Sequence, residues 1–578
     1  MKAIVATVFI GFLIHFGASC QNNLYTPLDD TLTFHHTTGG VIDTFDLTYT
    51  FPLISLPGGT IGKYNAAPTV DLFTNSPSLF LHQLPEIKSD WTISALPHIG
   101  FFYSFGTKGT QFLHADYQQS FLNKSLLNLE INRSSSQGMG RKSDFANQDF
   151  SLAYRFGQKK IHGDIKAIYI QNTTTLSGGI SNDSTWIDQG LAFAPIRKEN
   201  TTSLSRFINA EGALKFNFLS DSTSLSAGII TKHKYSLWNR VYNEVQDSLI
   251  NIYPFVNIDN DTTRDQFQDA KLKNSIGLYA ENKRFCFSIL GSHRYWRFQN
   301  LGAYVNQNET SADINLGVRM KKLLVNSESY FNLTGAQNEF YSKNSIKWGT
   351  SSKYISGGVS IESMLPSLVQ RFYYGNNLFY NSPLIKQNRN DINVTGAYSI
   401  WKIDAALTLG TLSWRNNLIW QNYSWMNGNG SNQTVNYIKA KLHFDLNWFH
   451  AYPEYLFQTG SDFLPKSVLS GRLLVKKKVF AAKKLELSFA VDPQLTSKYT
   501  FMSYNTLLDN WYFDSNNRAG GQSFSLHSTI TLHIEEFKFF IRTENLQAFW
   551  TPRNIEIAQD FYRPTFLLRL GISWDFFN

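Results

Sequence analysis

The chain has 578 residues and a formal net charge of +9; 15% of its residues are aromatic and only 17% are charged. The two cysteines, Cys20 and Cys286, exclude a disulfide framework and a thiol metal site. The basic residues are spread out, with Lys476–Lys478 as the densest run, which argues against a nucleic-acid-binding surface. A mean hydropathy of −0.25 despite 46 phenylalanines favours a membrane barrel with an apolar outside and a polar lumen.

The beginning of the sequence predicts a secretory signal peptide at residues 1–20. Lys2 precedes the short apolar stretch Ile4–Phe16, and the small residues of Gly17–Cys20 come next. Cleavage after Cys20 would leave Gln21 first, whereas the competing interpretation is a lipoprotein signal in which Cys20 is acylated. No other stretch reaches the ~18 consecutive apolar residues of a membrane helix. A membrane location would therefore require a closed barrel, because unpaired backbone groups cannot face lipid.

Residues 21–97 differ in composition from the remainder of the chain, because they contain many prolines, the pair Gly58-Gly59 and little alternation. This composition predicts an extended segment that lies in the periplasm or enters the lumen. The segment is shorter than the folded plug domain of the large ligand-gated barrels, which argues against energised uptake.

From residue 98 to residue 578 the sequence predicts an all-β fold, a transmembrane antiparallel β-barrel. Alternating runs recur, as in Phe150–Phe156, Leu442–Trp448 and Leu485–Val491, and a period of two is typical of strands. The stretch Phe566–Phe577 alternates over about the ~9–11 residues that a tilted transmembrane strand needs. Roughly twenty such runs predict an even number of strands between about 16 and 22, a size that leaves an aqueous lumen unless it is plugged.

The hairpin around Glu535-Glu536 gives the most detailed prediction. The apolar residues have even numbers from Phe524 to Ile534 and odd numbers from Phe537 to Ile541. A two-residue turn requires this change of parity, because the residues that flank it pair and share a face.

Short turns alternate with long polar connections along the chain. We expect short turns at residues 158–160, 219–222 and 535–536, and long loops at residues 172–203, 239–269, 425–433 and 506–521. Bacterial barrels place short turns on the periplasmic side and long loops outside.

Four short motifs recur in the order expected of one family: the turn Gly106–Gln111, Ser177–Ile180 followed by Asn182-Asp183, Arg542–Asn545 and Arg569–Phe577. On these motifs the chain resembles the putative porin family of Bacteroidetes outer membranes. The resemblance implies an outer-membrane channel in a Gram-negative bacterium and leaves the solute open.

Parity assigns a set of polar residues to the lumen wall. His443 and Asp445 could serve a barrel hydrolase as a dyad, but in a polar lumen they are ordinary wall residues, and we expect no enzyme activity, metal or cofactor. His527 and His533 lie ~20 Å apart along one strand at ~3.3 Å per residue, too far to share a metal.

We interpret Trp401, Trp414, Trp420, Trp425 and Trp448 as membrane-girdle residues. The predicted lumen-facing residues are Arg155, His443, Asp445, His527, His533, Arg542, Glu544, Arg569, Ser573 and Asp575.

The sequence thus predicts a single outer-membrane barrel that passes small hydrophilic solutes by diffusion. Its expected partners are outer-membrane lipid, the barrel-assembly machinery and those solutes, with no nucleic acid. The alternative is a plugged structural or assembly barrel that binds a partner through its loops or through residues 21–97.

Overall fold

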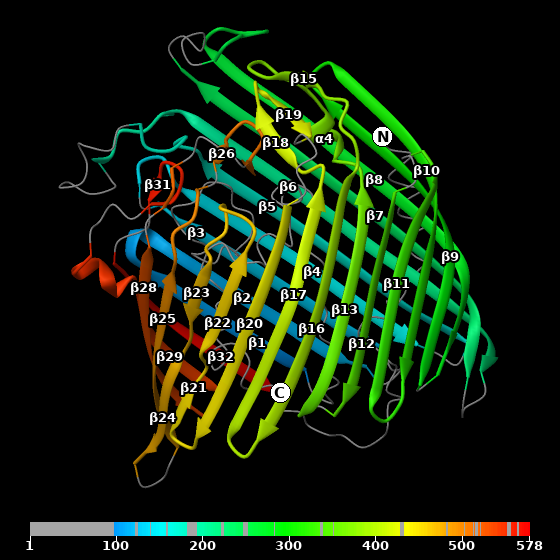
Figure 1. Ribbon diagram of the computed structural model, residues 1–578, viewed down its shortest axis with the longest axis vertical. Helices are drawn as coiled ribbons and strands as arrows, with labels where there is room; N and C mark the ends of the chain where they lie inside the picture. Colours follow the sequence, from blue (N-terminus) through cyan, green and yellow to red (C-terminus); the bar gives the residue numbers. More distant parts are fainter. Residues whose placement is uncertain are drawn as a thin grey trace.

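The computed structural model describes residues 97–577 with short gaps. The gaps lie at residues 122–124, 139, 158–159, 182–192, 221–224, 247–252, 283, 336–338, 351, 428–432, 481–483, 502, 513, 515–517, 521, 552–555 and 563–565. The predicted signal peptide and, apart from Pro97, the predicted entry segment lie outside the described residues. The described chain forms one large barrel of tilted strands (Figure 1).

The barrel is built from 24 strand segments. In chain order they are β1 (His98–Gly106), β2 (Thr110–Ser120), β3 (Leu126–Ser136), β4 (Phe145–Gly157), β5 (Ile161–Thr175), β6 (Thr201–Ser220), β7 (Ser226–Val245), β8 (Thr262–Glu281), β9 (Phe285–Asn300), β10 (Ala303–Arg319), β11 (Leu323–Thr334), β12 (Phe340–Gly349), β13 (Lys353–Met364), β16 (Gln387–Ile400), β17 (Ile403–Arg415), β20 (Gln433–Leu446), β21 (Phe449–Ala451), β22 (Glu454–Thr459), β23 (Ser467–Ser470), β24 (Leu473–Val479), β25 (Leu485–Thr496), β28 (Ser523–Ile534), β29 (Phe537–Glu544) and β32 (Leu567–Phe577).

The remaining elements lie in connections between barrel strands. They are η2 (Thr107–Gly109), α4 (Leu368–Arg371), β14 (Phe372–Tyr374), β15 (Phe379–Asn381), β18 (Leu418–Gln421), β19 (Ser424–Asn427), β26 (Ser503–Asn505), β27 (Asn510–Tyr512), η5 (Leu546–Phe549), β30 (Glu556–Ala558) and β31 (Phe561–Tyr562).

The segments make 22 antiparallel strands. β21 and β22 continue each other in one register on β20, and β23 and β24 do so on β25, so the 24 segments reduce by two. The first and last strands close the barrel, because β1 pairs with β32 from His98↔Phe577 to Gly106↔Arg569. The predicted all-β barrel is confirmed, and its strand number lies at the upper limit of the predicted range.

The sheet has two chemically distinct faces. We call the side that carries Asp492 and Arg542 the polar face and the side that carries Phe489 and Ile530 the apolar face; the paired registers extend both definitions around the barrel. Phe489 and Ile530 are 44% and 42% exposed although they are large and hydrophobic, whereas Asp492 is 1% exposed. A soluble protein would bury such side chains, so this arrangement is typical of a barrel in lipid.

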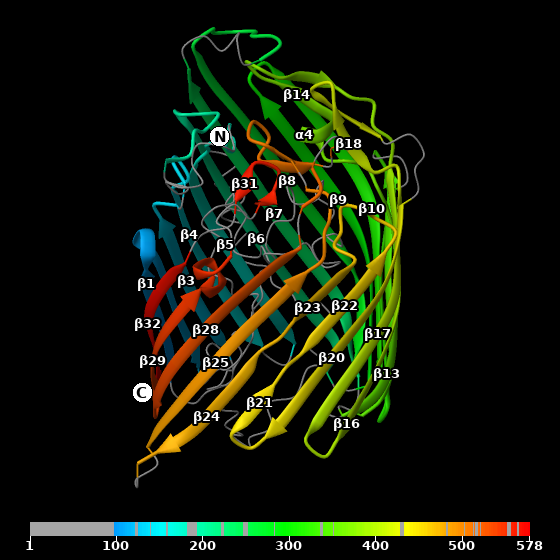
Figure 2. The same cartoon turned by 60° about the vertical axis from the view of Figure 1, so that its left-hand side comes forward.

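The two ends of the barrel also differ. The connections at residues 176–200, 246–261, 365–386, 416–432, 497–522 and 545–566 all lie at one end, whereas the opposite end has only short turns. Figures 1 and 2 show this asymmetry, with β14, β18 and β31 gathered at the end of the long loops. The predicted turn at 535–536 is confirmed. The predicted turns at 158–160 and 219–222 fall largely outside the described residues, between β4 and β5 and between β6 and β7.

The predicted loop boundaries need one larger correction. The loop expected at residues 239–269 spans only 246–261, because β7 and β8 are 20 residues long and extend beyond the apolar part of the wall. The Glu535-Glu536 hairpin has the expected register, with Ile534 opposite Phe537 and Ile530 opposite Ile541. Glu535 adopts a φ of 51°, as a tight two-residue turn between twisted strands requires. Among the described residues, none of the helices is both long and apolar enough for a membrane span.

Closure of the barrel leaves no room beside Gly571 of β32. A Cβ atom there would lie 2.3 Å from Cζ of Phe540 and 2.7 Å from the carbonyl oxygen of Tyr103, on the two neighbouring strands. We predict that Gly571→Ala lowers the free energy of unfolding by ~1–3 kcal/mol, the usual cost of overpacking. Urea titration of protein refolded into lipid vesicles, read by heat-modifiable gel mobility, measures this change. Gly396→Ala is the matched control, because nothing lies within 4 Å of its Cβ position; equal midpoints for the two variants would contradict the prediction.

Candidate channel mouth and polar wall

An aromatic row covers the polar face where β6 to β9 rise toward the long loops. Phe207 stacks on Trp238 with ring centroids 5.4 Å apart, and Trp238 meets Phe267 edge-on at 4.5 Å. Phe267 lies 6.0 Å from Phe298 on the next strand. These rings are neighbours because the registers place them opposite one another, Phe207↔Trp238 directly. They form an apolar platform on a face that is otherwise polar.

The 365–386 loop docks on this platform. Its short helix α4 begins with a capping box, in which the backbone N–H of Ser367 donates to Oε1 of Gln370 at 3.0 Å. The hairpin β14–β15 then brings Asn376 to β8, where its backbone N–H donates to Oδ1 of Asp265 at 2.9 Å. Asn376 Nδ2 donates to the carbonyl oxygen of Thr262 at 3.0 Å. Asp265 is only 2% exposed, so its carboxylate is buried between β8 and the docked loop.

A second loop, at 497–522, is held by Arg240 of β7. The Arg240 guanidinium is 1% exposed and donates to the carbonyl oxygens of Leu507 and of Thr506, the latter at 2.8 Å. Leu507 and Leu508 pack into the same apolar cluster as Trp238 and Phe267. A buried guanidinium without such acceptors would be costly, so docking of the loop and burial of Arg240 depend on each other.

A third loop, at 416–432, completes the cluster and corrects the girdle prediction. Trp425 is 1% exposed and contacts Trp420 at 5.1 Å, and Trp420 in turn contacts Tyr380 of the 365–386 loop. Trp414 is likewise buried, in a separate cluster on the polar face. These three tryptophans therefore do not form a girdle, because loop packing gives them apolar partners inside the barrel end. Trp401 and Trp448 are exposed in short turns at the opposite end.

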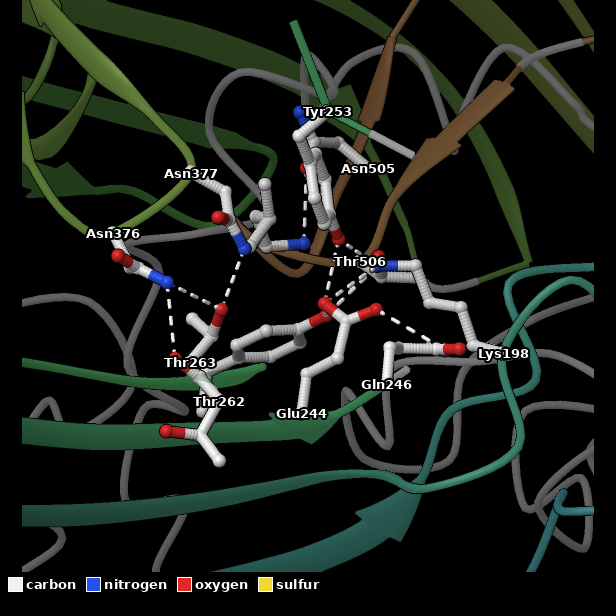
Figure 3. A network of polar contacts seen from close by, with 12 residues as sticks. Lys198, Glu244, Gln246, Tyr253, Thr262, Thr263, Asn376, Asn377, Asn505 and Thr506 are labelled. Atoms are coloured by element: carbon white, nitrogen blue, oxygen red, sulfur yellow. Dashed lines mark hydrogen bonds and ion pairs between the residues drawn. The ribbon is translucent and has the colours of Figure 1, made fainter. Parts of the chain in front are cut away.

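A polar network joins two further loops to the same wall (Figure 3). Lys198, from the 176–200 loop, donates to Glu244 of β7 at 3.2 Å and to the hydroxyl of Tyr242 at 2.9 Å. Tyr253, from the 246–261 loop, donates to Oε2 of Glu244 at 2.6 Å. Burial lowers the pKa of the Lys198 ammonium and raises the pKa of the Tyr253 phenol. The phenol therefore stays protonated at neutral pH and can act as the donor.

Together these contacts place three loops from other parts of the barrel against the wall formed by β6 to β9. β13, β17 and β25, which lead into the docked loops, are separated in the barrel from β7 and β8. Figure 2 shows the loop elements across the upper end of the barrel. We call this assembly, the 365–386, 416–432 and 497–522 loops with their wall contacts, the mouth cover.

Beyond the mouth cover, the polar face carries a ladder of ion pairs along β24, β25, β29 and β32. Arg472 and Arg542 both bind Asp492, at 2.6 and 3.1 Å. Arg542 also binds Glu544 at 3.1 Å, and Arg569 donates to Glu544 at 3.3 Å. The structure thus brings together three predicted wall residues, Arg542, Glu544 and Arg569. With Arg472 and Asp492 the ladder contains three guanidinium groups and two carboxylates, so most of its charge is compensated and a net +1 remains.

The structure separates the predicted His443–Asp445 pair. His443 Nδ1 lies 3.0 Å from Asp404 on the neighbouring strand, and its ring stacks on Tyr452 at 4.4 Å. Asp445 instead lies 3.4 Å from His450. Each of the two side chains instead contacts its direct cross-strand partner, because the registers place His443 opposite Asp404 and Asp445 opposite His450.

The other predicted wall residues lie apart from one another. Arg155 pairs with Asp164 at 3.5 Å, His527 accepts a hydrogen bond from the backbone N–H of Asn545 at 3.2 Å, and Asp575 lies 3.8 Å from His98. His533 is opposite Lys538, and Ser573 is buried opposite the same lysine. Within the described part of the chain, no group of three or more His, Cys, Asp or Glu side chains could hold a metal ion.

Sequence reasoning missed the 365–386 loop, which contributes most to the mouth cover. Two signals were present in the sequence. Ser367 and Gln370 have capping-box spacing, and Gly375-Asn376-Asn377 is a turn signature. Arg240 carries no local signal for loop docking, because its partners in the docked loop lie more than 260 residues away in the sequence.

The Arg240 contact yields a direct test of the mouth cover. We predict that Arg240→Gln releases the 497–522 loop, because losing the buried donor costs ~1–3 kcal/mol. Trypsin should then cleave the folded protein several-fold faster after Lys498 or Arg518. Arg141→Gln is the control, because the Arg141–Glu199 pair is about half exposed in another loop. Cleavage at the wild-type rate would show that Arg240 does not hold the loop.

Solved barrels of similar architecture are outer-membrane receptors and transporters. The FrpB iron transporter from Neisseria meningitidis matches with a TM-score of 0.60 and 8% identity, over 84% of this chain and 82% of that one. The pyoverdine receptor FpvA from Pseudomonas aeruginosa has a TM-score of 0.58 and 11% identity, over 85% and 80%. The siderophore receptor PirA from Acinetobacter baumannii has a TM-score of 0.58 and 10% identity, over 85% and 81%. At this identity the likeness concerns the fold alone.

A comparison with curated proteins finds no match. The model of one family does match, and it spans residues 88–578, which include every strand of the barrel. The chain therefore belongs to the putative porin family and is a large β-barrel of the outer membrane.

Proposed function

We propose that this protein is a porin-like channel through which small hydrophilic solutes diffuse passively across the outer membrane. The observation that carries the proposal is the segregation of charge. Every acidic residue of the described barrel strands lies on the polar face, as Asp391, Asp404 and Glu454 illustrate. In a membrane barrel the apolar face contacts lipid, so the polar face lines the lumen.

Part of this wall is accessible. Lys441 and Asp404 are about half exposed, and Lys441 binds Glu454 at 3.2 Å. Such residues contrast with the buried ladder at Asp492, which lies a few strands farther along the wall on β25. A wall of alternating acids and bases passes hydrated solutes of either charge and sets only a mild preference. The mouth cover then limits the size of the solute that enters.

Planar bilayers test the channel itself. Purified protein should give stepwise conductance increments at low voltage in potassium chloride. A barrel that never conducts, under any voltage or salt, would refute passive diffusion.

A charge reversal tests whether the polar face meets the permeating ions. Lys441→Glu should shift the reversal potential in a salt gradient toward cation selectivity, because it removes an exposed positive charge and adds a negative one. Lys477→Glu is the control, since Lys477 lies on a nearby strand but on the apolar face. An equal shift in both variants, or none in either, would contradict the assignment of the polar face to the lumen.

One observation favours a second function. The barrel has 22 strands, whereas porins have ~16–18 and the plugged outer-membrane transporters have ~22. The similar solved structures are described as siderophore receptors and an iron transporter. We therefore keep a plugged, partner-binding barrel as the alternative. Deleting residues 21–97 separates the two: unchanged conductance supports the open channel, and a large increase supports the plugged barrel.

A further inference from the structure

The apolar face of the barrel has an uneven distribution of charge. On this face the described barrel strands carry no acidic residue. The lysines and arginines there are Lys353 and Lys477 near the short turns, and Arg133, Arg206, Arg264, Arg297 and Arg415 toward the long loops. Two histidines, His233 and His293, lie on the same face about midway along β7 and β9. Of the lysines and arginines on this face, only arginines therefore occur at the end that carries the long loops.

Three of these arginines come directly after the apolar run of their strand. On β6 the outward residues are apolar or small from Phe218 to Ile208, and Arg206 is the next one. On β9 the outward residues from Phe285 to Tyr295 are apolar, aromatic or small except His293, and Arg297 is the next one. Both runs match the ~9–11 residues that a tilted strand needs to cross a membrane.

The third arginine, on β3, follows a shorter apolar run but lies in the same cross-strand row as Arg206, through Gln148 and Gln171. Leu127, Leu129 and Ile131 face outward, and Arg133 comes next. Arg264 and Arg415 lie farther from the apolar run of their strands. The guanidinium groups of Arg133, Arg206 and Arg297 consequently lie at the boundary where the hydrocarbon ends and the headgroups begin.

Arg206 and Arg297 have neutral partners on the outer wall. Arg206 Nε donates to Oε1 of Gln171 at 3.2 Å, and an Arg297 terminal nitrogen donates to Oε1 of Gln299 at 3.0 Å. The Arg297 guanidinium also lies over the Tyr304 ring, 5.0 Å from its centroid. These partners are neutral and hold the side chains against the outer wall. On the polar face, by contrast, arginines such as Arg542 are paired with carboxylates.

We propose that Arg133, Arg206 and Arg297 bind the phosphate groups of outer-leaflet lipid headgroups. A guanidinium presents donors in a planar fork that matches phosphate oxygens, and at a membrane surface the pair is partly desolvated and strong. The partner is a phosphorylated lipid, because the arginines lie on the lipid-facing surface at headgroup depth. The arginines thus fix the depth of the barrel in the membrane and recruit anionic lipid around it.

Native mass spectrometry of the full chain, released from micelles with equimolar phosphatidylglycerol and phosphatidylcholine, tests the proposal. Wild-type protein should retain several-fold more phosphatidylglycerol than phosphatidylcholine. The triple variant Arg133→Gln, Arg206→Gln and Arg297→Gln should retain the two lipids equally. The triple Lys variant at the same positions should keep an intermediate preference, because it keeps the charge and loses the fork.

The matched control removes three charges from the polar face through Lys343→Gln, Lys439→Gln and Lys441→Gln. It should keep the wild-type lipid preference, and heat-modifiable gel mobility checks that each variant is folded. The single Gln variants provide the test if the triple variant does not fold. A wild-type protein without preference, or a folded triple Gln variant with the full preference, would overturn the proposal.

Discussion

The whole structure depends on one constraint, which is that a sheet in lipid can leave no strand edge unpaired. Every buried backbone amide needs a partner, and lipid offers none. The pairing of β1 with β32 meets this requirement and fixes the parity of every strand between them. Odd- and even-numbered side chains of a strand lie on opposite faces of the sheet. Phe489 and Asp492 of β25 are therefore on different faces.

The size of the closed barrel is a second constraint, because a wide lumen leaves a wide opening at each end. Twenty-two strands enclose a lumen too wide for side chains from the wall to fill. The chain narrows one end by returning three loops across the opening and seating them on the aromatic row around Trp238 and Phe267. Buried polar groups such as Arg240 and Asp265 then become anchors, because the arriving loop backbone supplies the partners that water would otherwise supply. For the same reason each loop docks at one defined place on the wall, where its backbone meets these buried polar groups.

The wall and the mouth cover differ in how far the sequence predicts them. Alternation is a local signal, so about a dozen residues are enough to predict the Glu535-Glu536 hairpin and the length of the last strand. Parity also predicts which residues share a face with Arg569. It does not predict that Arg569 binds Glu544, since cross-strand neighbours depend on the register between strands that are distant in the sequence. The mouth cover depends on contacts such as that of Arg240 with Leu507, which no local pattern encodes. For the same reason the tryptophans at 414, 420 and 425 resemble girdle residues in sequence and are core residues in the fold.

We propose that the barrel is a water-filled passage whose outer opening is limited by docked loops. Liposome swelling with sugars of graded size measures this size limit, in wild-type protein and in a variant that carries Arg240→Gln and Asn376→Ala together. We expect wild-type liposomes to swell only in the smallest sugars, and liposomes with the variant to admit larger sugars at a higher rate. Identical size limits for the two proteins, or no swelling with either, would contradict it.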